Sequence, residues 1–360
     1  MLKVIENLAG KIEARWRMDD YSCYSFADIA KSEMQKVDLI SLFSFKEINS
    51  LLNLNSLKKI QIASEFSELH MKLFDNGKFY IELLNWWDKD TSIHDHGFSG
   101  VLLQLEGSAL NTIYSFDEEN EVSHNLSMGN IKLTEAYISK KGDCRIIPFG
   151  RTEKHAVWHL EKPTISLIVR THPITELSPQ LNYFPPYIRI NHSAINIAFN
   201  KKIKYFNLLS MIDAKECKNQ LLQELKDSSA TEQFWLMMKM SEFLYHPDNI
   251  DLLQGYIDAS KNEDEKSLKL KLVSSVTLRR SSQFIINKVK PLFTKFDDRL
   301  FLSCLASSYN QEDRAMIFPE MGIENVEDKL TTLIENLPVT VKPKMMIHVL
   351  KTLGLNVESK

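Results

Sequence analysis

The segment Ser92-Ile93-His94-Asp95-His96 carries two histidines two positions apart in a stretch that reads as a β-strand. Side chains alternate between the two faces of a strand, so His94 and His96 point to the same side. A third histidine, His155, follows later in the chain, just after Pro148-Phe149-Gly150. A histidine on a neighbouring strand can complete a facial metal site inside a small β-barrel. Imidazoles suit zinc, copper, iron and nickel, and positions left open on the ion indicate catalysis.

The composition is that of an ordinary globular protein. The chain has 360 residues, of which 44% are hydrophobic and 25% charged, with a net charge of -3. This length allows one large domain or two of average size, and the balanced charge argues against nucleic-acid binding. The sequence has no apolar run that predicts a membrane span and no signal peptide at its start. Its four cysteines lack CxxC spacing, which predicts a cytoplasmic protein with reduced thiols.

Glycine usage separates a β-rich part from a helical part. Seven of the eleven glycines lie between Gly77 and Gly150, where short runs of Val, Ile, Leu and Tyr alternate with turn residues such as 117–120. Many short strands at close spacing favour a barrel or a jelly roll. The predicted strands are Phe79–Asn85, Ser92–His96, Gly100–Glu106, Leu110–Phe116, Ala136–Ser139, Cys144–Pro148, Ala156–Leu160 and Thr164–Arg170.

The rest of the chain reads as helical. Apolar residues at helical spacing occur in the first 75 residues, and again after Pro185-Pro186, for example at Tyr205, Leu208 and Ile212. We therefore expect an α+β protein with two domains. Residues 1–190 would form the barrel with an N-terminal helical segment, and residues 191–360 an α-helical domain.

Several motifs resemble the cysteine dioxygenase family of cupins across residues 67–173. These motifs are Asn76-Gly77-Lys78-Phe79, Trp86, Thr91-Ser92-Ile93-His94-Asp95-His96, Leu105-Glu106-Gly107-Ser108, and His155 followed by Pro163-Thr164-Ile165-Ser166-Leu167. The resemblance implies a double-stranded β-helix, the barrel of cupins.

The resemblance also implies a mononuclear Fe(II) centre held by His94, His96 and His155, with O2 as co-substrate. Most cupins add a glutamate shortly after the first histidine pair, but Gly100 and Val101 stand at that place, as in the three-histidine thiol dioxygenases. Three neutral imidazoles leave the full +2 charge on iron, which an anionic thiolate can partly neutralise. Three open positions then accommodate a bidentate substrate and O2.

Other positions depart from the family. Its arginine for the substrate carboxylate would fall near Leu69 or His70, neither of which can form a bidentate salt bridge. Its crosslinking cysteine falls at Val101, which cannot crosslink. We therefore expect the substrate to be a thiol other than free L-cysteine, such as a peptide, a carrier-linked group or another small thiol.

The family's Ser-x-His-x-Tyr triad aligns with Ser166, Ile168 and Arg170, so only the serine is retained. Arg170 occupies the place of the tyrosine and would point into the barrel. It is a candidate catalytic residue that grips a carboxylate or another anionic group. The alternative is a structural ion pair with a barrel acid such as Glu106 or Glu82.

Other residues near the predicted site have competing interpretations. His159 lies four residues after His155 and is the alternative third ligand, although His155 fits the spacing of the resemblance better. Trp86 is a candidate for the wall of the substrate pocket. Trp87 and Trp158 are further candidates, with core packing expected for at least two of the three tryptophans.

Two functions from different classes fit these features. The first is an Fe(II)-dependent oxygenase of the thiol-dioxygenase type, with a small-molecule or peptide substrate. The second is a non-catalytic cupin that binds a metal or a ligand as a sensor or scaffold. The helical domain is a possible site for a protein partner, and no membrane or nucleic-acid partner is expected.

Overall fold

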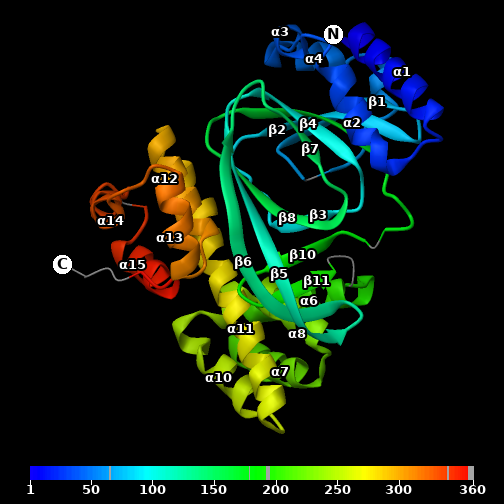
Figure 1. Cartoon of the computed structure of the whole chain (residues 1–360). Coiled ribbons are helices and arrows are strands. Elements are labelled where there is room, and N and C mark those ends of the chain that lie inside the picture. The colour runs from blue at the N-terminus through cyan, green and yellow to red at the C-terminus, as the bar shows by residue number, and fades with distance from the viewer. Residues whose placement is uncertain (65, 178, 192–194, 339, 356–360) are drawn as a thin grey trace. The chain divides into compact units, whose positions relative to one another are not determined.

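The computed structural model describes residues 1–64, 66–177, 179–191, 195–338 and 340–355, and contains N-terminal helices, a central set of strands and C-terminal helices (Figure 1). This confirms the α+β class with a double-stranded β-helix. The N-terminal helices are α1 Leu2–Met18, α2 Cys23–Met34, α3 Leu39–Leu42, α4 Ile48–Leu52 and α5 Asn55–Lys58. The strands are β1 Leu69–Asp75, β2 Phe79–Trp86, β3 Ile93–His96, β4 Gly100–Glu106, β5 Ala109–Ser123, β6 Leu126–Ser139, β7 Cys144–Ile147, β8 Gly150–His159, β9 Thr164–Thr171, β10 Leu181–Phe184 and β11 Ile188–Asn191. The C-terminal helices are α6 Ile197–Ile212, α7 Ala214–Asp227, α8 Ala230–Lys239, α9 Ser241–Leu244, α10 Asp251–Asp258, α11 Glu263–Phe284, α12 Phe296–Ser307, α13 Gln311–Glu320, α14 Val326–Glu335 and α15 Pro343–Thr352.

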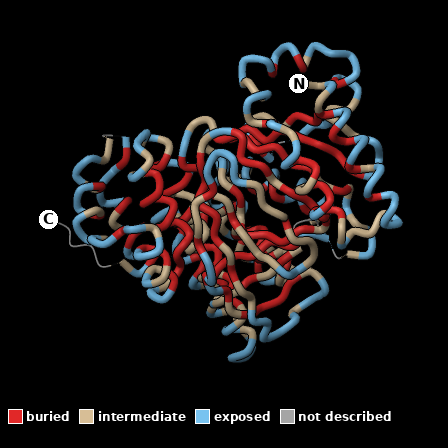
Figure 2. The backbone as a smooth tube through the Cα atoms, turned by 45° about the horizontal axis from the view of Figure 1, so that its top comes forward, coloured by how far each residue is buried: buried red, intermediate tan, exposed pale blue. Residues whose placement is uncertain are grey.

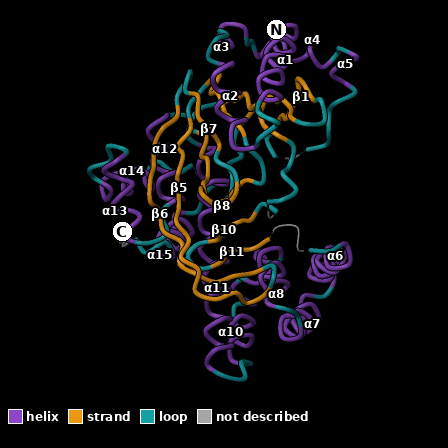
Figure 3. The backbone as a smooth tube through the Cα atoms, turned by 45° about the vertical axis from the view of Figure 1, so that its right-hand side comes forward, coloured by secondary structure: helices purple, strands orange, loops and turns teal. Residues whose placement is uncertain are grey.

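The strands form two sheets. One has the order β1-β2-β9-β4-β7, and the other closes in the order β10-β11-β6-β5-β8-β3. The longest strands, β5 and β6, run side by side in Figure 3. The turn predicted at 117–120 is wrong, because β5 continues through it to Ser123. The acidic residues there sit on the exposed end of a strand, where charged side chains are tolerated.

The chain divides into two compact units that are discontinuous in sequence. One consists of Met1–Ile113, Glu135–Gln180 and Val289–Ser303, and the other contains the remaining segments. The first unit therefore includes Val289–Ser303, which comes from the helical part of the chain. The expected division between residues 190 and 191 would assign this segment to the other domain. The three histidines lie in this first unit.

In the first unit, the sheet that contains β2, β4 and β9 is covered on one face by helices. Helices α1 and α2 place their apolar stripes against this face, where they share one core with the strands. Alternate strand residues contribute to that core, and the residues between them face the opposite side. Residues of β2 and β9 are buried at nearly every position, and Figure 2 colours the buried stretches of the backbone red. These strands are thus mostly apolar, and several of their polar residues lie on the second face.

The second unit has its own core, built mainly from helices. On α6 the buried residues are Phe199, Ile203 and Phe206, and they pack with apolar residues of α7, α8, α10 and α11. The predicted helix at this place is confirmed, but the apolar residues Leu208 and Ile212 are exposed. No helix within the described ranges has the length and apolar character needed to span a membrane.

Candidate metal centre

Polar side chains gather in a cavity of about 210 Å³ in the first unit. They come from alternate positions of adjacent strands, as the period of two requires. The cavity-facing residues of the main strands are Glu82, Leu84 and Trp86 of β2; His94 and His96 of β3; Leu102 and Gln104 of β4; Glu153, His155, Val157 and His159 of β8; and Ser166, Ile168 and Arg170 of β9. The cavity is therefore lined by the predicted ligands His94, His96 and His155 and by the candidates Arg170 and Trp86.

The three predicted ligands come together at one place. In the antiparallel pairing of β3 with β8, His94 lies directly opposite His155. The potential ligand atoms of His94, His96 and His155 all lie within 4.8 Å of one another. The Nε2 atoms of His96 and His155 are 3.2 Å apart. Two nitrogens that bind one ion at about 2.0–2.1 Å have a separation of this size. The geometry thus fits a divalent metal.

The protonation state of the cluster also fits a metal. The Nδ1 of His94 lies 2.7 Å from the carbonyl oxygen of Ser92. A carbonyl only accepts hydrogen bonds, so Nδ1 carries the hydrogen and Nε2 keeps its lone pair for a ligand. Burial lowers the pKa of His94, and it lowers the pKa values of His96 and His155 well below the ordinary histidine value. All three imidazoles are therefore neutral, the form that binds metal.

The structure gives a physical reason for the missing fourth ligand. A Cβ atom at Gly100 would lie 2.9 Å from the Cβ of Arg170 and 3.0 Å from the carbonyl oxygen of Val169. Strand β9 approaches β4 so closely at this pair that no side chain fits. A carboxylate ligand at position 100 would require β9 to move. The geometry thus agrees with a three-histidine site.

His159 does not belong to the cluster formed by His94, His96 and His155 within the described residues. It lies at the end of β8, four positions beyond His155 on the same face of the strand. Its imidazole instead stacks on the indole of Trp86, with ring centroids 4.5 Å apart. The geometry therefore favours His155 over the alternative ligand considered from the sequence.

Arg170 forms an ion pair inside the cavity. Its Nε donates to Oε1 of Glu82 at 2.9 Å, and the other oxygen of Glu82 lies 2.5 Å from Nε2 of His70. Burial raises the pKa of Glu82, but its contacts with His70 and Arg170 outweigh burial and hold it below the ordinary value. The structural ion pair with Glu82, weighed against a substrate-binding role from the sequence, is thus present. The cationic guanidinium still borders the cavity.

Aromatic residues fix the plane of this guanidinium. The centre of the Arg170 guanidinium lies 4.3 Å from the ring centroid of Phe98 and 4.7 Å from that of Tyr80. Such cation–π contacts orient a planar cation near the metal cluster. Trp86 lines the cavity, whereas the indole nitrogen of Trp158 donates to Thr112 in the core and Trp87 is about half exposed.

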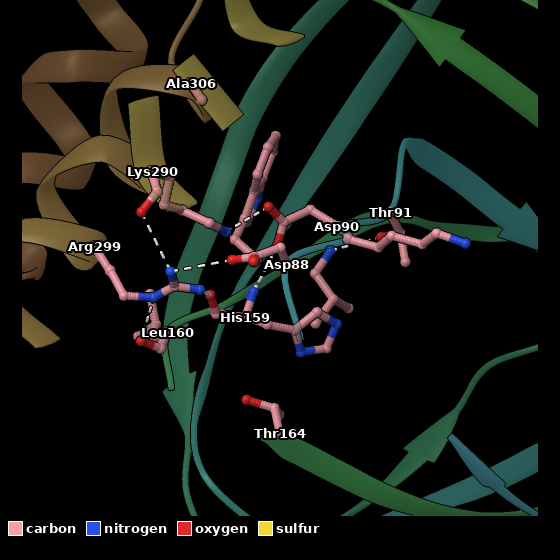
Figure 4. Close-up of polar contacts among 12 residues, drawn as sticks. Asp88, Asp90, Thr91, His159, Leu160, Thr164, Lys290, Arg299 and Ala306 are labelled. Atoms are coloured by element: carbon pink, nitrogen blue, oxygen red, sulfur yellow. Dashed lines mark hydrogen bonds and ion pairs between the residues drawn. The ribbon is translucent and has the colours of Figure 1, made fainter. Parts of the chain in front are cut away.

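Sequence reasoning missed a buried ion-pair cluster behind β8. Lys290 contacts a carboxylate oxygen of Asp90, and both side chains are almost completely buried. Arg299 donates to the backbone carbonyls of His159 and Leu160, and the backbone N–H of His159 donates to Asp90 (Figure 4). The cluster thus holds the end of β8. The partners lie far apart in the chain, so no local sequence pattern reveals them.

Comparisons with known proteins found distant likenesses among solved structures. No protein-family model and no curated protein sequence matches this chain. Similar solved structures include a cupin superfamily protein from Desulfitobacterium hafniense, with 18% identity, 32% of this chain and 86% of that chain covered, and a TM-score of 0.21. A hydroquinone 1,2-dioxygenase from Sphingomonas sp. TTNP3 with 4-hydroxybenzoate bound has 10% identity, coverages of 30% and 68%, and a TM-score of 0.24.

The buried histidines predict how stability depends on pH. In the unfolded chain, His94, His96, His155 and His159 bind protons below about pH 6.5, whereas their lowered pKa values keep them neutral when folded. The unfolded state then holds more protons than the folded state, so the free energy of unfolding decreases as the pH is lowered. The loss is at most about 1.4 kcal/mol per histidine for each pH unit below 6.5.

Urea denaturation of the metal-free protein between pH 8 and pH 5 measures this loss. The lower limit avoids the separate effect of Glu82. Because the pKa of Glu82 is lowered in the folded state, its contribution to the stability of the protein is lost mainly below about pH 4.3, the pKa of an unperturbed glutamate. A free energy of unfolding that stays constant from pH 7 to pH 5 would contradict the prediction.

Proposed function

We propose that this protein is an Fe(II)-dependent oxygenase of the thiol-dioxygenase type, acting on a thiol other than free L-cysteine. The observation that carries the proposal is the convergence of three neutral imidazoles, two of them buried and one partly buried, in one cavity. Iron bound by His94, His96 and His155 would supply the coordination positions at which a thiolate and O2 react. The protein's own residues would place the substrate and exclude water.

Arg170 is the residue that we expect to orient an anionic substrate. Phe98 and Tyr80 orient the guanidinium of Arg170 through cation–π contacts, and this group borders the cavity near the histidines. It lies over the ring of Phe98, whose centroid is 4.8 Å from that of the His96 ring. Because Glu82 already binds Nε, an anion would meet the remaining side of the guanidinium.

The test is metal analysis of anaerobically purified protein, followed by oxygen-electrode assays against a panel of thiols. The proposal expects bound iron and stoichiometric oxygen uptake with at least one thiol. The metal-free His94→Ala variant is the control for uncatalysed thiol oxidation. A protein that binds metal but consumes no oxygen with any thiol would instead support a metal-binding cupin that acts as a sensor or scaffold.

Substitution of Arg170 is expected to reduce activity without loss of iron. Arg170→Ala removes the cation, so kcat/KM for an anionic thiol should fall by roughly ten- to a hundredfold, the worth of a charge-assisted contact. Arg170→Lys keeps the charge but loses the planar fork, so its activity should fall by less. L-cysteine should be a poor substrate, because Leu69 and His70 provide no carboxylate clamp. Arg189→Lys is the control, because Arg189 pairs with Glu118 outside the cavity. Rapid oxidation of L-cysteine, unaffected by Arg170→Ala, would refute this role.

A further inference from the structure

His159 is a buried polar residue that the metal centre does not use. Its side chain lines the cavity, and only 2% of the residue is exposed. Neither ring nitrogen has a hydrogen-bond partner among the described residues. Buried polar atoms in folded proteins are nearly always paired, so an unpaired imidazole in a cavity needs an explanation. A bound ligand group that pairs with these nitrogens provides one.

The surroundings of His159 keep its ring in place and neutral. Asp90 binds its backbone N–H, Arg299 binds its backbone carbonyl, and Trp86 stacks on its ring. Burial lowers its pKa well below the ordinary value, and the charges of Lys290 and Arg299 lower it further. A neutral imidazole presents one N–H donor and one nitrogen acceptor. The cavity therefore offers a fixed donor–acceptor pair next to an indole.

The strand register places this pair away from the metal cluster. His159 lies four positions beyond His155 along β8, and Trp86 lies four positions beyond Glu82 along β2. Four residues of a strand span about 13 Å at the backbone. The cluster and Arg170 thus occupy one end of the cavity, and the stacked rings of Trp86 and His159 occupy the other. L-cysteine is too short to reach both ends.

The geometry points to a second binding point in the cavity, in which His159 and Trp86 recognise an amide group of an elongated substrate. A carboxamide or peptide amide is neutral and carries both a donor and an acceptor, which matches a neutral imidazole. Its planar surface suits contact with an indole. This inference rests on the proposed function, because it takes the occupant of the cavity to be the substrate.

Binding of benzamide and toluene to the metal-free, full-length protein tests the inference. The two molecules have similar shape, but only benzamide carries an amide. Ligand-detected NMR titrations give the ratio of the dissociation constants of benzamide and toluene. His159→Phe keeps an aromatic ring beside Trp86 and removes both nitrogens, so this ratio should rise by about two- to twelvefold, the usual worth of a neutral hydrogen bond. His159→Gln retains a donor and an acceptor and should restore part of the preference.

Two further measurements complete the test. His124→Gln alters an exposed histidine outside the cavity and should leave the ratio unchanged. The ring ¹⁵N signals of His159 should shift on addition of benzamide and not of toluene. An unchanged ratio in His159→Phe, or ring ¹⁵N signals of His159 that do not respond to benzamide, would overturn the inference. Because these titrations use neither metal nor oxygen, their result is independent of whether the protein oxidises thiols.

Discussion

Replacing His155 with alanine is expected to strip nearly all bound metal from the protein while the barrel stays folded. The substitution removes one of three ligands, and His94 and His96 then hold the ion from a single strand. Loss of residues that merely orient a ligand costs about ten- to a hundredfold in metal affinity, so loss of a ligand should cost at least about a hundredfold. Metal analysis after anaerobic purification, with circular dichroism as the check of folding, measures the effect.

His159→Ala is the matched control, because His159 lies on the same face of β8 as His155. It should retain the full amount of metal. If His159→Ala loses the metal and His155→Ala keeps it, the assignment of the third ligand is wrong. If both variants keep full occupancy, the three-histidine centre itself is refuted.

Replacing Lys290 with methionine is expected to destabilise the protein strongly. Asp90 would remain buried without its cation, and removing one partner of a buried ion pair typically costs about 3–5 kcal/mol. Burial already raises the pKa of Asp90, and the charge of Lys290 opposes that effect. In the variant, the folded-state pKa of Asp90 should rise further above its unfolded value. The difference in stability from the wild type should then be largest near neutral pH and shrink as Asp90 is protonated at lower pH.

Urea denaturation of both proteins as a function of pH measures this difference. Lys141→Met is the control, since Lys141 and its partner Glu106 are about half exposed, and it should change stability by no more than about 1 kcal/mol. The double variant Lys290→Met with Asp90→Asn should be more stable than Lys290→Met alone. A single variant as stable as the wild type would show that the cluster contributes nothing. A fragment that ends at residue 190 lacks Lys290 and Arg299, so it should fold poorly.

The strand pattern in the sequence predicted part of the histidine cluster. The period of two places His94 and His96 on one face of a strand, while the resemblance pointed to His155, which the structure pairs directly opposite His94. The same period places Trp86 and Arg170 inside the barrel. The limits of β5 were harder to predict, because the charged residues at 117–120 favour a turn locally but are tolerated on an exposed strand end.

The face that a helix buries was also beyond the sequence alone. Apolar residues occur on two sides of α6, and both sides have helical spacing. The structure buries Phe199, Ile203 and Phe206, while Leu208 and Ile212 remain exposed. Periodicity identifies a helix from its own residues, but the buried side depends on which elements pack against it.

The sequence by itself placed His94 and His96 on one face of a strand, because side chains alternate along a strand. It also indicated an α+β protein with a barrel of short strands, whereas alternation alone did not separate His155 from His159, which share one face of β8. Only the tertiary structure decided how Arg170 and His159 are held. Glu82 binds Arg170 across paired strands, and the chain folds back over a long distance to bring Lys290 and Arg299 behind His159. Such contacts depend on packing between distant segments, whose partners no local pattern specifies.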